Sequence, residues 1–163
     1  MAASKSKSGT QPVAIEMLVA DHKLVKSLFE QYEDEKEADE DTRRGIAERI
    51  CGELTVHAQV EEELFYPWLR ENLSEEDMEM VEEAEVEHGS AKDLIAQIES
   101  AEEVDAVYDA KVKVLGEYID HHVKEEEGEM FPKVRKSDLD LDALGEDMAA
   151  RKAELLGEDA DRH

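Results

Sequence analysis

Apolar residues recur every three or four positions along four stretches of this chain, which is the period of an amphipathic α-helix. In the first stretch Ile15, Leu18, Val25 and Phe29 mark the apolar stripe, and the other three stretches repeat the pattern. No run alternates apolar and polar residues for long enough to predict a strand. Four long amphipathic helices with short connections predict an all-α fold, an antiparallel up-down four-helix bundle.

Capping residues and prolines indicate where the expected helices begin and end. Ser100 and Glu103 have the spacing of a capping box, so the fourth helix is expected to begin there. Pro67 and Pro132 lack a backbone donor, so the second and fourth helices are expected to kink or end close to them.

The polarity of the chain divides it into three parts. Residues 1–11 are polar and predict a flexible leader, residues 12–136 contain the expected bundle, and residues 137–163 form a C-terminal extension. Four apolar residues of the extension have roughly helical spacing: Leu141, Leu144, Met148 and Leu155. They predict a short amphipathic helix that docks on the bundle.

Six polar residues occupy positions in the stripes where apolar side chains are expected. They are His22, His57, Glu61, His88, His122 and Glu126. A shift of 65 residues superposes the pair His57 and Glu61 on the pair His122 and Glu126, and a shift of 66 superposes His22 on His88. The chain therefore contains an internal repeat, and each half contributes one histidine and one His-x-x-x-Glu pair.

These six residues predict a metal site. A single histidine in such a helix is more often a core residue bonded to a neighbouring acid. Burying the ionised acids without compensation would cost on the order of several kcal/mol each, against a domain stability of about 5–15 kcal/mol. One or two metal ions would satisfy all six groups. Cys51 is the only cysteine and is expected to be a small core residue, so the donors are nitrogen and oxygen. Such donors suit iron, manganese, zinc or copper, of which iron is favoured.

In this pattern the chain resembles the hemerythrin-like, or HHE cation-binding, domains. Their signature is a histidine, a His-x-x-x-Glu pair, a third histidine and a second pair, and the likeness extends from about Val13 to Lys136. The resemblance implies a four-helix bundle with a non-haem diiron site. It also implies that the two carboxylates and an oxo or hydroxo group bridge the two iron ions.

One feature departs from the oxygen-carrying hemerythrins, which the chain otherwise resembles. Those proteins have two histidines four residues apart on the third helix, whereas the positions on either side of His88 at this spacing are Ala84 and Lys92. One iron is therefore expected to lack a nitrogen ligand. Tyr118, Glu85 or a water molecule could fill the place, and a tyrosine bonded to a neighbour in the core is the alternative for Tyr118.

Several other charged residues lie close to the stripes. His121 also has a carboxylate four residues on, but only His122 falls on the stripe of Leu115 and Ile119, so His121 is expected at the edge of the seam. Three glutamates are expected to form solvated faces: Glu62, Glu63 and Glu127. Two lysines either contact the ligand residues or cover apolar surface with their stems: Lys26 and Lys92.

The charge of the chain limits its partners. It has 45 acidic and 19 basic residues, a formal net charge of −26, which opposes binding to phosphate backbones and anionic lipids. Neither nucleic acid nor a membrane is therefore an expected partner. Residues 1–10 lack the apolar stretch of a secretory signal, which predicts a cytoplasmic location.

The expected partner is a small oxidant: dioxygen, peroxide or nitric oxide. Two classes of function stay open, an oxidoreductase that decomposes peroxide and a non-catalytic protein that binds or senses oxygen, nitric oxide or iron. No nucleophile or acid–base pair stands apart from the metal set, so no separate organic substrate is expected. Five apolar residues are expected to limit the access of water: Val25, Leu54, Phe65, Ile119 and Phe131.

Overall fold

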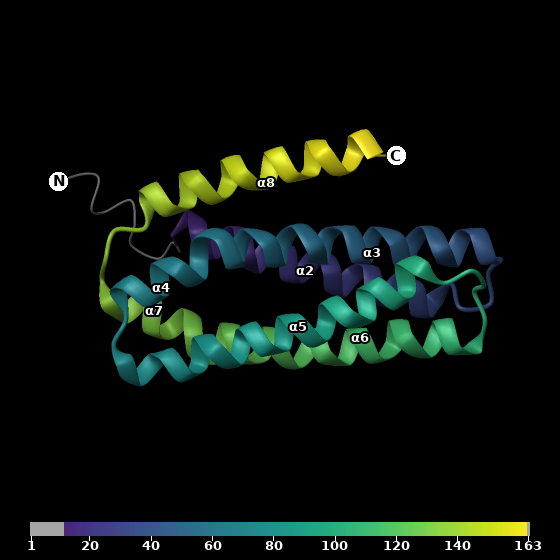
Figure 1. Ribbon diagram of the computed structural model, residues 1–163, viewed down its shortest axis with the longest axis horizontal. Coiled ribbons are helices and arrows are strands. Elements are labelled where there is room, and N and C mark those ends of the chain that lie inside the picture. Colours follow the sequence, from purple (N-terminus) through teal and green to yellow (C-terminus); the bar gives the residue numbers. More distant parts are fainter. Residues whose placement is uncertain (1–11, 163) are drawn as a thin grey trace.

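The computed structural model describes residues 12–162, with side chains described through residue 157, and within this range the regular elements are all helical. The predicted leader, residues 1–11, lies outside the described residues. Four helices form the bundle: α2 (Val13–Asp34), α3 (Glu40–Val60), α5 (Met78–Ser100) and α6 (Ala106–Glu125). In Figure 1 the pair α2 and α3 lies beside the pair α5 and α6. The predicted all-α bundle is confirmed.

The second and fourth helices of the bundle each continue through a π-helical turn. The π-helix η1 (Glu61–Phe65) follows α3 and leads into α4 (Tyr66–Asn72). In the second half, η3 (Glu126–Met130) leads in the same way from α6 into α7 (Phe131–Ser137). Both π-helices begin at a glutamate of the predicted metal set.

These turns explain how the helices continue past the prolines. Pro67 and Pro132 lie at the first positions of α4 and α7. A proline is tolerated at such a position because its missing donor is not needed there. The helices therefore run on to Asn72 and Ser137, and the expectation that they end close to the prolines is correct only in part.

The connection between α5 and α6 differs from the expected one. The helix α5 runs as far as Ser100, so this residue does not cap the next helix. Asp105 is the N-cap of α6 instead, because its Oδ1 accepts a hydrogen bond of 2.9 Å from the backbone N–H of Tyr108. Before α5, a short 3-10 helix, η2 (Glu75–Asp77), completes the other connection.

The C-terminal helix α8 (Asp142–Arg162) packs on α2 and α3 along one side of the bundle (Figure 1). It has 21 residues, so the expectation of a short helix is wrong, although the helix docks as expected. A Cβ atom on Gly145 would lie 3.1 Å from the backbone nitrogen of Ala14. The glycine therefore allows the start of α8 to approach the start of α2 closely.

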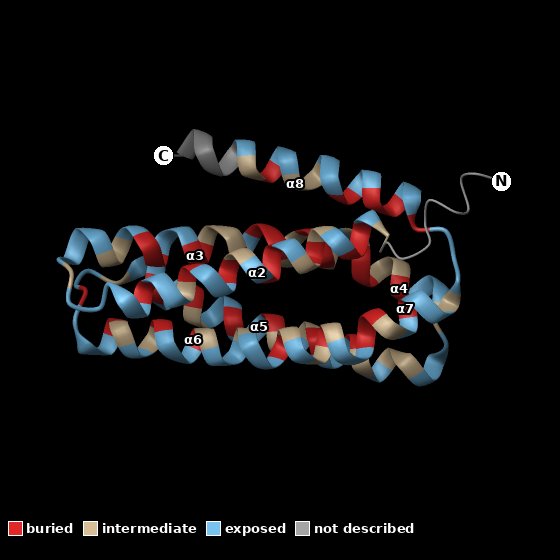
Figure 2. Ribbon diagram, turned by 180° about the vertical axis from the view of Figure 1, so that it is seen from behind, coloured by how far each residue is buried: buried red, intermediate tan, exposed pale blue. Residues whose placement is uncertain are grey.

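The buried apolar residues form two clusters (Figure 2). One cluster, which includes Leu18, Phe65 and Phe131, lies toward α4, α7 and α8. The other includes Val25 and the free thiol of Cys51, which is buried as predicted and whose pKa burial raises to about 12. Among the described residues, no helix is both long and apolar enough to cross a membrane.

Candidate metal centre

The bundle brings all six sequence-predicted ligand residues together in its interior. They come from α2, α3, α5, α6 and the first residue of each π-helix, and none is more than 8% exposed. The six are His22, His57, Glu61, His88, His122 and Glu126. Isolated buried polar groups of this kind are costly, so the cluster needs partners within the core.

The donor atoms form two groups, each of two histidines and one glutamate. One group is His22, His57 and Glu126, and the other is Glu61, His88 and His122, with donor atoms within 4.8 Å of one another in each. The histidine rings of a group face each other, with centroids 5.1 Å apart for His22 and His57 and 4.9 Å for His88 and His122. Each group thus takes both histidines from one half of the repeat and its carboxylate from the other.

Each glutamate faces histidines of both halves. Glu61 Oε1 lies 3.4 Å from His57 Nε2 and 3.1 Å from His88 Nε2. In the second half, Glu126 Oε1 lies 3.1 Å from His22 Nε2, and Glu126 Oε2 lies 3.2 Å from His122 Nε2. Both carboxylates therefore have the position of a bridge between two cations.

The other ring nitrogen of each histidine is held by a further carboxylate. The four Nδ1 distances are 2.7 Å for His22 to Glu127, 2.8 Å for His57 to Asp21, 2.8 Å for His88 to Glu62 and 2.7 Å for His122 to Glu87. A carboxylate on Nδ1 fixes the ring orientation and directs Nε2 toward a metal. The expectation that Glu62 and Glu127 only form solvated faces is therefore wrong.

The internal repeat contained the signal for these four carboxylates. The shift of 66 residues that aligns His22 with His88 also aligns Asp21 with Glu87. The shift of 65 residues that aligns the two bridging glutamates aligns Glu62 with Glu127. An acid next to a ligand is unremarkable in a glutamate-rich helix, but its repetition in both halves is the feature that sequence reasoning missed.

Two lysines hold carboxylates of this outer set. Lys92 Nζ lies 2.6 Å from Glu62 Oε1, so of the two interpretations of Lys92 the contact with a ligand's partner is confirmed. Lys152 of α8 pairs with Asp21, whose other oxygen contacts His57. Through this lysine the C-terminal helix is connected to the centre.

His121 lies outside the centre, as expected, with 67% of its side chain exposed. Its Nε2 lies 3.3 Å from Glu125 Oε2 and 3.6 Å from Glu87 Oε2. The adjacent His122 is the one that points into the bundle. The position of His122 on the apolar stripe therefore predicted correctly which of the two histidines is buried.

A tyrosine that the sequence did not single out lies within the centre. The hydroxyl of Tyr66 donates to Glu126 Oε2 at 2.9 Å, lies 3.2 Å from His88 Nε2 and is 3.3 Å from Glu61 Oε1. Its position follows from the π-helix, since the backbone N–H of Tyr66 bonds to the carbonyl of Glu61 five residues earlier. Under the shift of 65 residues Tyr66 aligns with Phe131, and this difference between the halves was the available signal.

The two residues proposed from the sequence for an additional ligand lie farther toward the surface. Tyr118 is 48% exposed and lines a cavity beside the histidines. Glu85 is 40% exposed at its side chain and pairs with Arg70. Of the three candidates only Tyr66 is fully buried and in contact with the six residues.

The electrostatics of the centre favour opposite charges on its two kinds of donor. Burial lowers the pKa of His122, but hydrogen bonding to Glu126 and its charge outweigh burial and raise this pKa to about 10. Burial raises the pKa of Glu126, but hydrogen bonds from His122 and His22 hold it well below its usual value. Burial also opposes ionisation of His57, yet the charge of Glu61 raises its pKa well above normal. A cation that binds the imidazoles must therefore displace protons.

The residues fit a metal ion on the evidence of their free donor atoms. The buried atoms without a hydrogen-bond partner include His22 Nε2, His57 Nε2 and His122 Nε2, together with one oxygen of each bridging glutamate. Native proteins rarely leave so many buried polar atoms unsatisfied. Five such atoms at one point indicate that a cation completes them.

An acidic pocket of about 400 Å³ reaches the centre from the surface. His122 and Glu126 are among its lining residues. The remaining lining is dominated by acids: Glu76, Asp77, Glu79, Glu83, Glu87, Glu125 and Glu129. A cleft of one sign of charge raises the local concentration of the opposite ion, so this pocket favours the entry of cations.

The fold and the site together define a class of protein, a helical bundle whose core carries histidine and carboxylate donors for cations. The family model of the hemerythrin HHE cation binding domain matches residues 13–134. The chain belongs to this family, which confirms the resemblance noted from the sequence.

A solved structure and a curated relative are similar to this chain. A hemerythrin HHE cation binding domain-containing protein from Mycobacterium kansasii has a TM-score of 0.72 and 25% identity, with 89% of this chain and 88% of that chain covered. A DNA nickase from Nostoc sp. is 28% identical over 117 residues, which are 72% of this chain and 32% of the nickase. The chain thus spans about a third of the length of the nickase.

Proposed function

We propose that this protein is a non-haem diiron protein that binds or reacts with a small oxidant such as dioxygen, peroxide or nitric oxide. The observation that carries the proposal is the convergence of four imidazoles and two carboxylates in the core, with their free atoms directed inward. Nitrogen and oxygen donors without thiolate suit iron. Two carboxylates that each face both halves suit a pair of ions rather than one.

Bound iron would supply the redox chemistry. The residues of the chain control its surroundings: the outer carboxylates hold the imidazole rings in orientation and raise their basicity as ligands. The apolar clusters on both sides of the centre restrict water. The hydroxyl of Tyr66 holds a proton in contact with Glu126.

We further propose that Tyr66 takes the place of the missing fifth histidine. Its hydroxyl lies beside the group of Glu61, His88 and His122, the group that contains the third-helix histidine. Burial and the charges of Glu126 and Glu61 raise the pKa of Tyr66 well above its usual value, so a bound cation is needed to favour its phenolate form. Tyr118 and Glu85 are the alternatives from the sequence, but their exposure makes them weaker candidates.

Among reactions with an oxidant, we favour the decomposition of peroxide. The centre departs from the five-histidine carrier at the position where Tyr66 stands, and this tyrosine brings a transferable proton to the centre. The alternative is a non-catalytic protein that binds or senses oxygen, nitric oxide or iron through the same residues.

Iron loading tests the proposed centre. Anaerobic titration with ferrous ion is expected to load about two equivalents per chain and to raise the melting temperature. His122→Ala should reduce the loading, whereas His121→Ala, which removes the exposed neighbouring imidazole, should leave it unchanged. Loading below about one equivalent with an unchanged melting temperature would contradict the diiron proposal.

Turnover separates the two classes of function. Catalytic consumption of peroxide by the iron-loaded protein, lost in Glu126→Ala and retained in His121→Ala, would support the enzyme. A reversible spectral change with dioxygen and no turnover of peroxide would instead support the binding or sensing function.

A further inference from the structure

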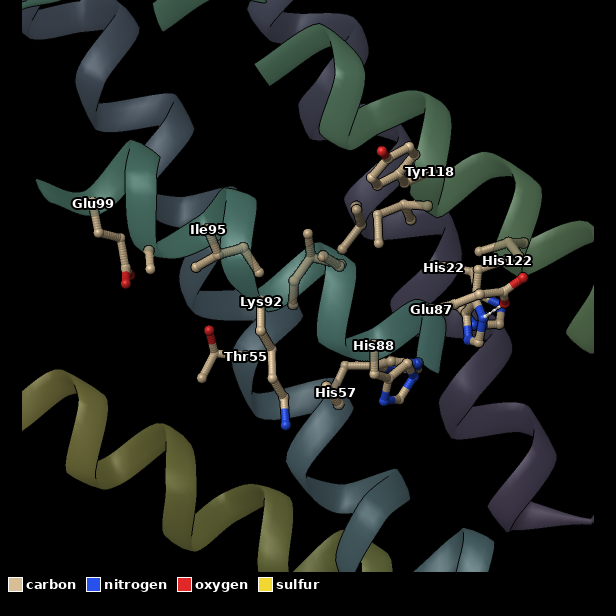
Figure 3. Close-up of a pocket in the computed structure, with 17 residues that line it drawn as sticks. His22, Thr55, His57, Glu87, His88, Lys92, Ile95, Glu99, Tyr118 and His122 are labelled. Atoms are coloured by element: carbon tan, nitrogen blue, oxygen red, sulfur yellow. Dashed lines mark hydrogen bonds and ion pairs between the residues drawn. The ribbon is translucent and has the colours of Figure 1, made fainter. Parts of the chain in front are cut away.

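A second, apolar cavity of about 250 Å³ lies on the other side of the metal centre from the acidic pocket, among residues of α2, α3, α5 and α6. All four histidines of the centre are among the residues that line it. Figure 3 shows the labelled histidines grouped toward one side of the cavity, with Glu99 on the opposite side. Most of the remaining wall is apolar: Val25, Leu54, Ala91, Ile95, Ile119 and Val123. The cavity therefore adjoins the centre directly.

The cavity is much larger than the oxidants considered above need. Dioxygen and peroxide each have only two heavy atoms. An engineered apolar cavity of about 150 Å³ is enough to bind benzene. At about 250 Å³ this cavity can hold a larger molecule. Its size corresponds to on the order of six to ten non-hydrogen atoms.

The wall of the cavity also selects the polarity of its occupant. A buried water needs two to four polar partners, and Val25, Ile95 and Ile119 offer none at their side chains. An apolar molecule buries its own surface and that of the wall at a gain of roughly 25 cal/mol per Å². The apolar part of the cavity therefore favours a hydrocarbon surface over water.

The charges around the cavity oppose an anion. Glu87 and Glu99 both line it, and the chain as a whole carries a net charge of −26. Lys92 is the one lysine that lines this cavity, and its ammonium group is held by Glu62 at 2.6 Å. A carboxylate or phosphate ligand would thus meet repulsion without an available cationic partner.

We propose that this cavity binds an uncharged, largely apolar organic molecule, about the size of benzene to naphthalene, against the histidines of the metal centre. The proposal replaces the expectation from the sequence that no organic ligand is involved. Binding itself needs only the cavity. Its coupling to an oxidant rests on the proposed function, because only iron at the six ligands would bring the two together.

Titration of the full-length protein with benzene, in metal-free and iron-loaded forms, tests the proposal. Methyl resonances of Val25, Leu54 and Ile95 should shift and saturate. Ala91→Phe fills the buried part of the cavity and should weaken binding by at least about tenfold. Ala96→Phe, at an exposed position of the lining, should do the same without a demand on the core. Ala110→Phe adds the same ring at an exposed position of α6 outside the lining and should bind as the wild type does.

The outcomes separate this proposal from the diiron function. Saturable binding that both cavity variants weaken supports the cavity proposal, whether or not iron loads. Shifts that never saturate, or equal binding in the wild type and both folded variants, overturn it even if two iron ions load. A failure of iron loading with benzene binding intact would count against the proposed function alone.

Discussion

Tyr66 and Phe131 occupy equivalent positions in the two halves of the repeat, and each ring packs against the first histidine of the opposite half. The ring centroids are 5.3 Å apart for Tyr66 and His88 and 6.1 Å apart for Phe131 and His22. Only Tyr66 carries a hydroxyl, which lies 3.2 Å from His88 Nε2. The approximate symmetry of the bundle is therefore broken by one oxygen atom at the centre.

Tyr66→Phe should remove this difference without a change of shape. If Tyr66 binds iron, the variant will lose any phenolate-to-iron absorption band and will bind iron more weakly. Phe131 shows that a phenylalanine ring is accommodated at the equivalent position. Visible spectra and iron titrations of both forms provide the measurement. Tyr118→Phe is the matched control, and a band that is lost only in that variant would transfer the role to Tyr118.

Iron uptake should release protons and become tighter as pH rises. His122 has a pKa raised to about 10, above its unfolded value of about 6.5, mainly because Glu126 outweighs burial. The stability that this protonation contributes to the metal-free protein is complete below the unfolded pKa and is lost as pH rises through about 10. At neutral pH the metal must displace this proton. An indicator dye in weakly buffered solution measures the release, which His122→Ala should diminish; loading with no proton release would refute the assignment.

Lys152→Met should weaken the centre from the surface of α8. The lysine pairs with Asp21, which holds His57 Nδ1 at 2.8 Å, so its loss leaves the orienting carboxylate less firmly fixed. Loss of a direct partner of a metal-ligating histidine typically costs about 10–100-fold in affinity, and the effect through Asp21 should be up to about tenfold.

The iron dissociation constant and the melting temperature measure the effect of Lys152→Met. Lys124→Met is the matched control because Lys124 is 75% exposed and its pair with Asp120 lies on the surface of one helix. Equal iron affinities for the two variants would show that α8 does not act on the centre.

Asp105→Ala should destabilise the fold without an effect on the centre. Its side chain accepts a hydrogen bond from Tyr108 N–H at the start of α6, and loss of such a cap costs about 1 kcal/mol. Glu103→Ala, at the position that the sequence assigned to a capping box, should change the free energy of unfolding by less than about 0.5 kcal/mol. Urea denaturation of the two variants measures both values, and a larger loss for Glu103→Ala would contradict the observed cap.

The periodicity of the sequence was sufficient to predict the bundle and the burial of the six ligands. Helical spacing is a local property, so His22 on the stripe of Ile15 and Leu18 had to face the same interior as they do. The two shifts of the repeat added the symmetry. The same local rules misjudged Ser100 and the length of α8, because capping depends on where the preceding helix stops and helix length depends on docking.

Tertiary structure decided how the ligands are combined. Spacing along one helix pairs His57 with Glu61, but the packing of four helices also brings Glu61 to His88 and Glu126 to His22. Such contacts depend on the rotation and axial position of one helix against another, which hydrophobic period alone does not specify. The π-helical turn likewise brings Tyr66 to the centre, and α8 brings Lys152 to Asp21 across 131 positions of sequence. The sequence by itself therefore determined which residues are donors, and the packing determined which cations, partners and neighbouring cavity those donors can serve.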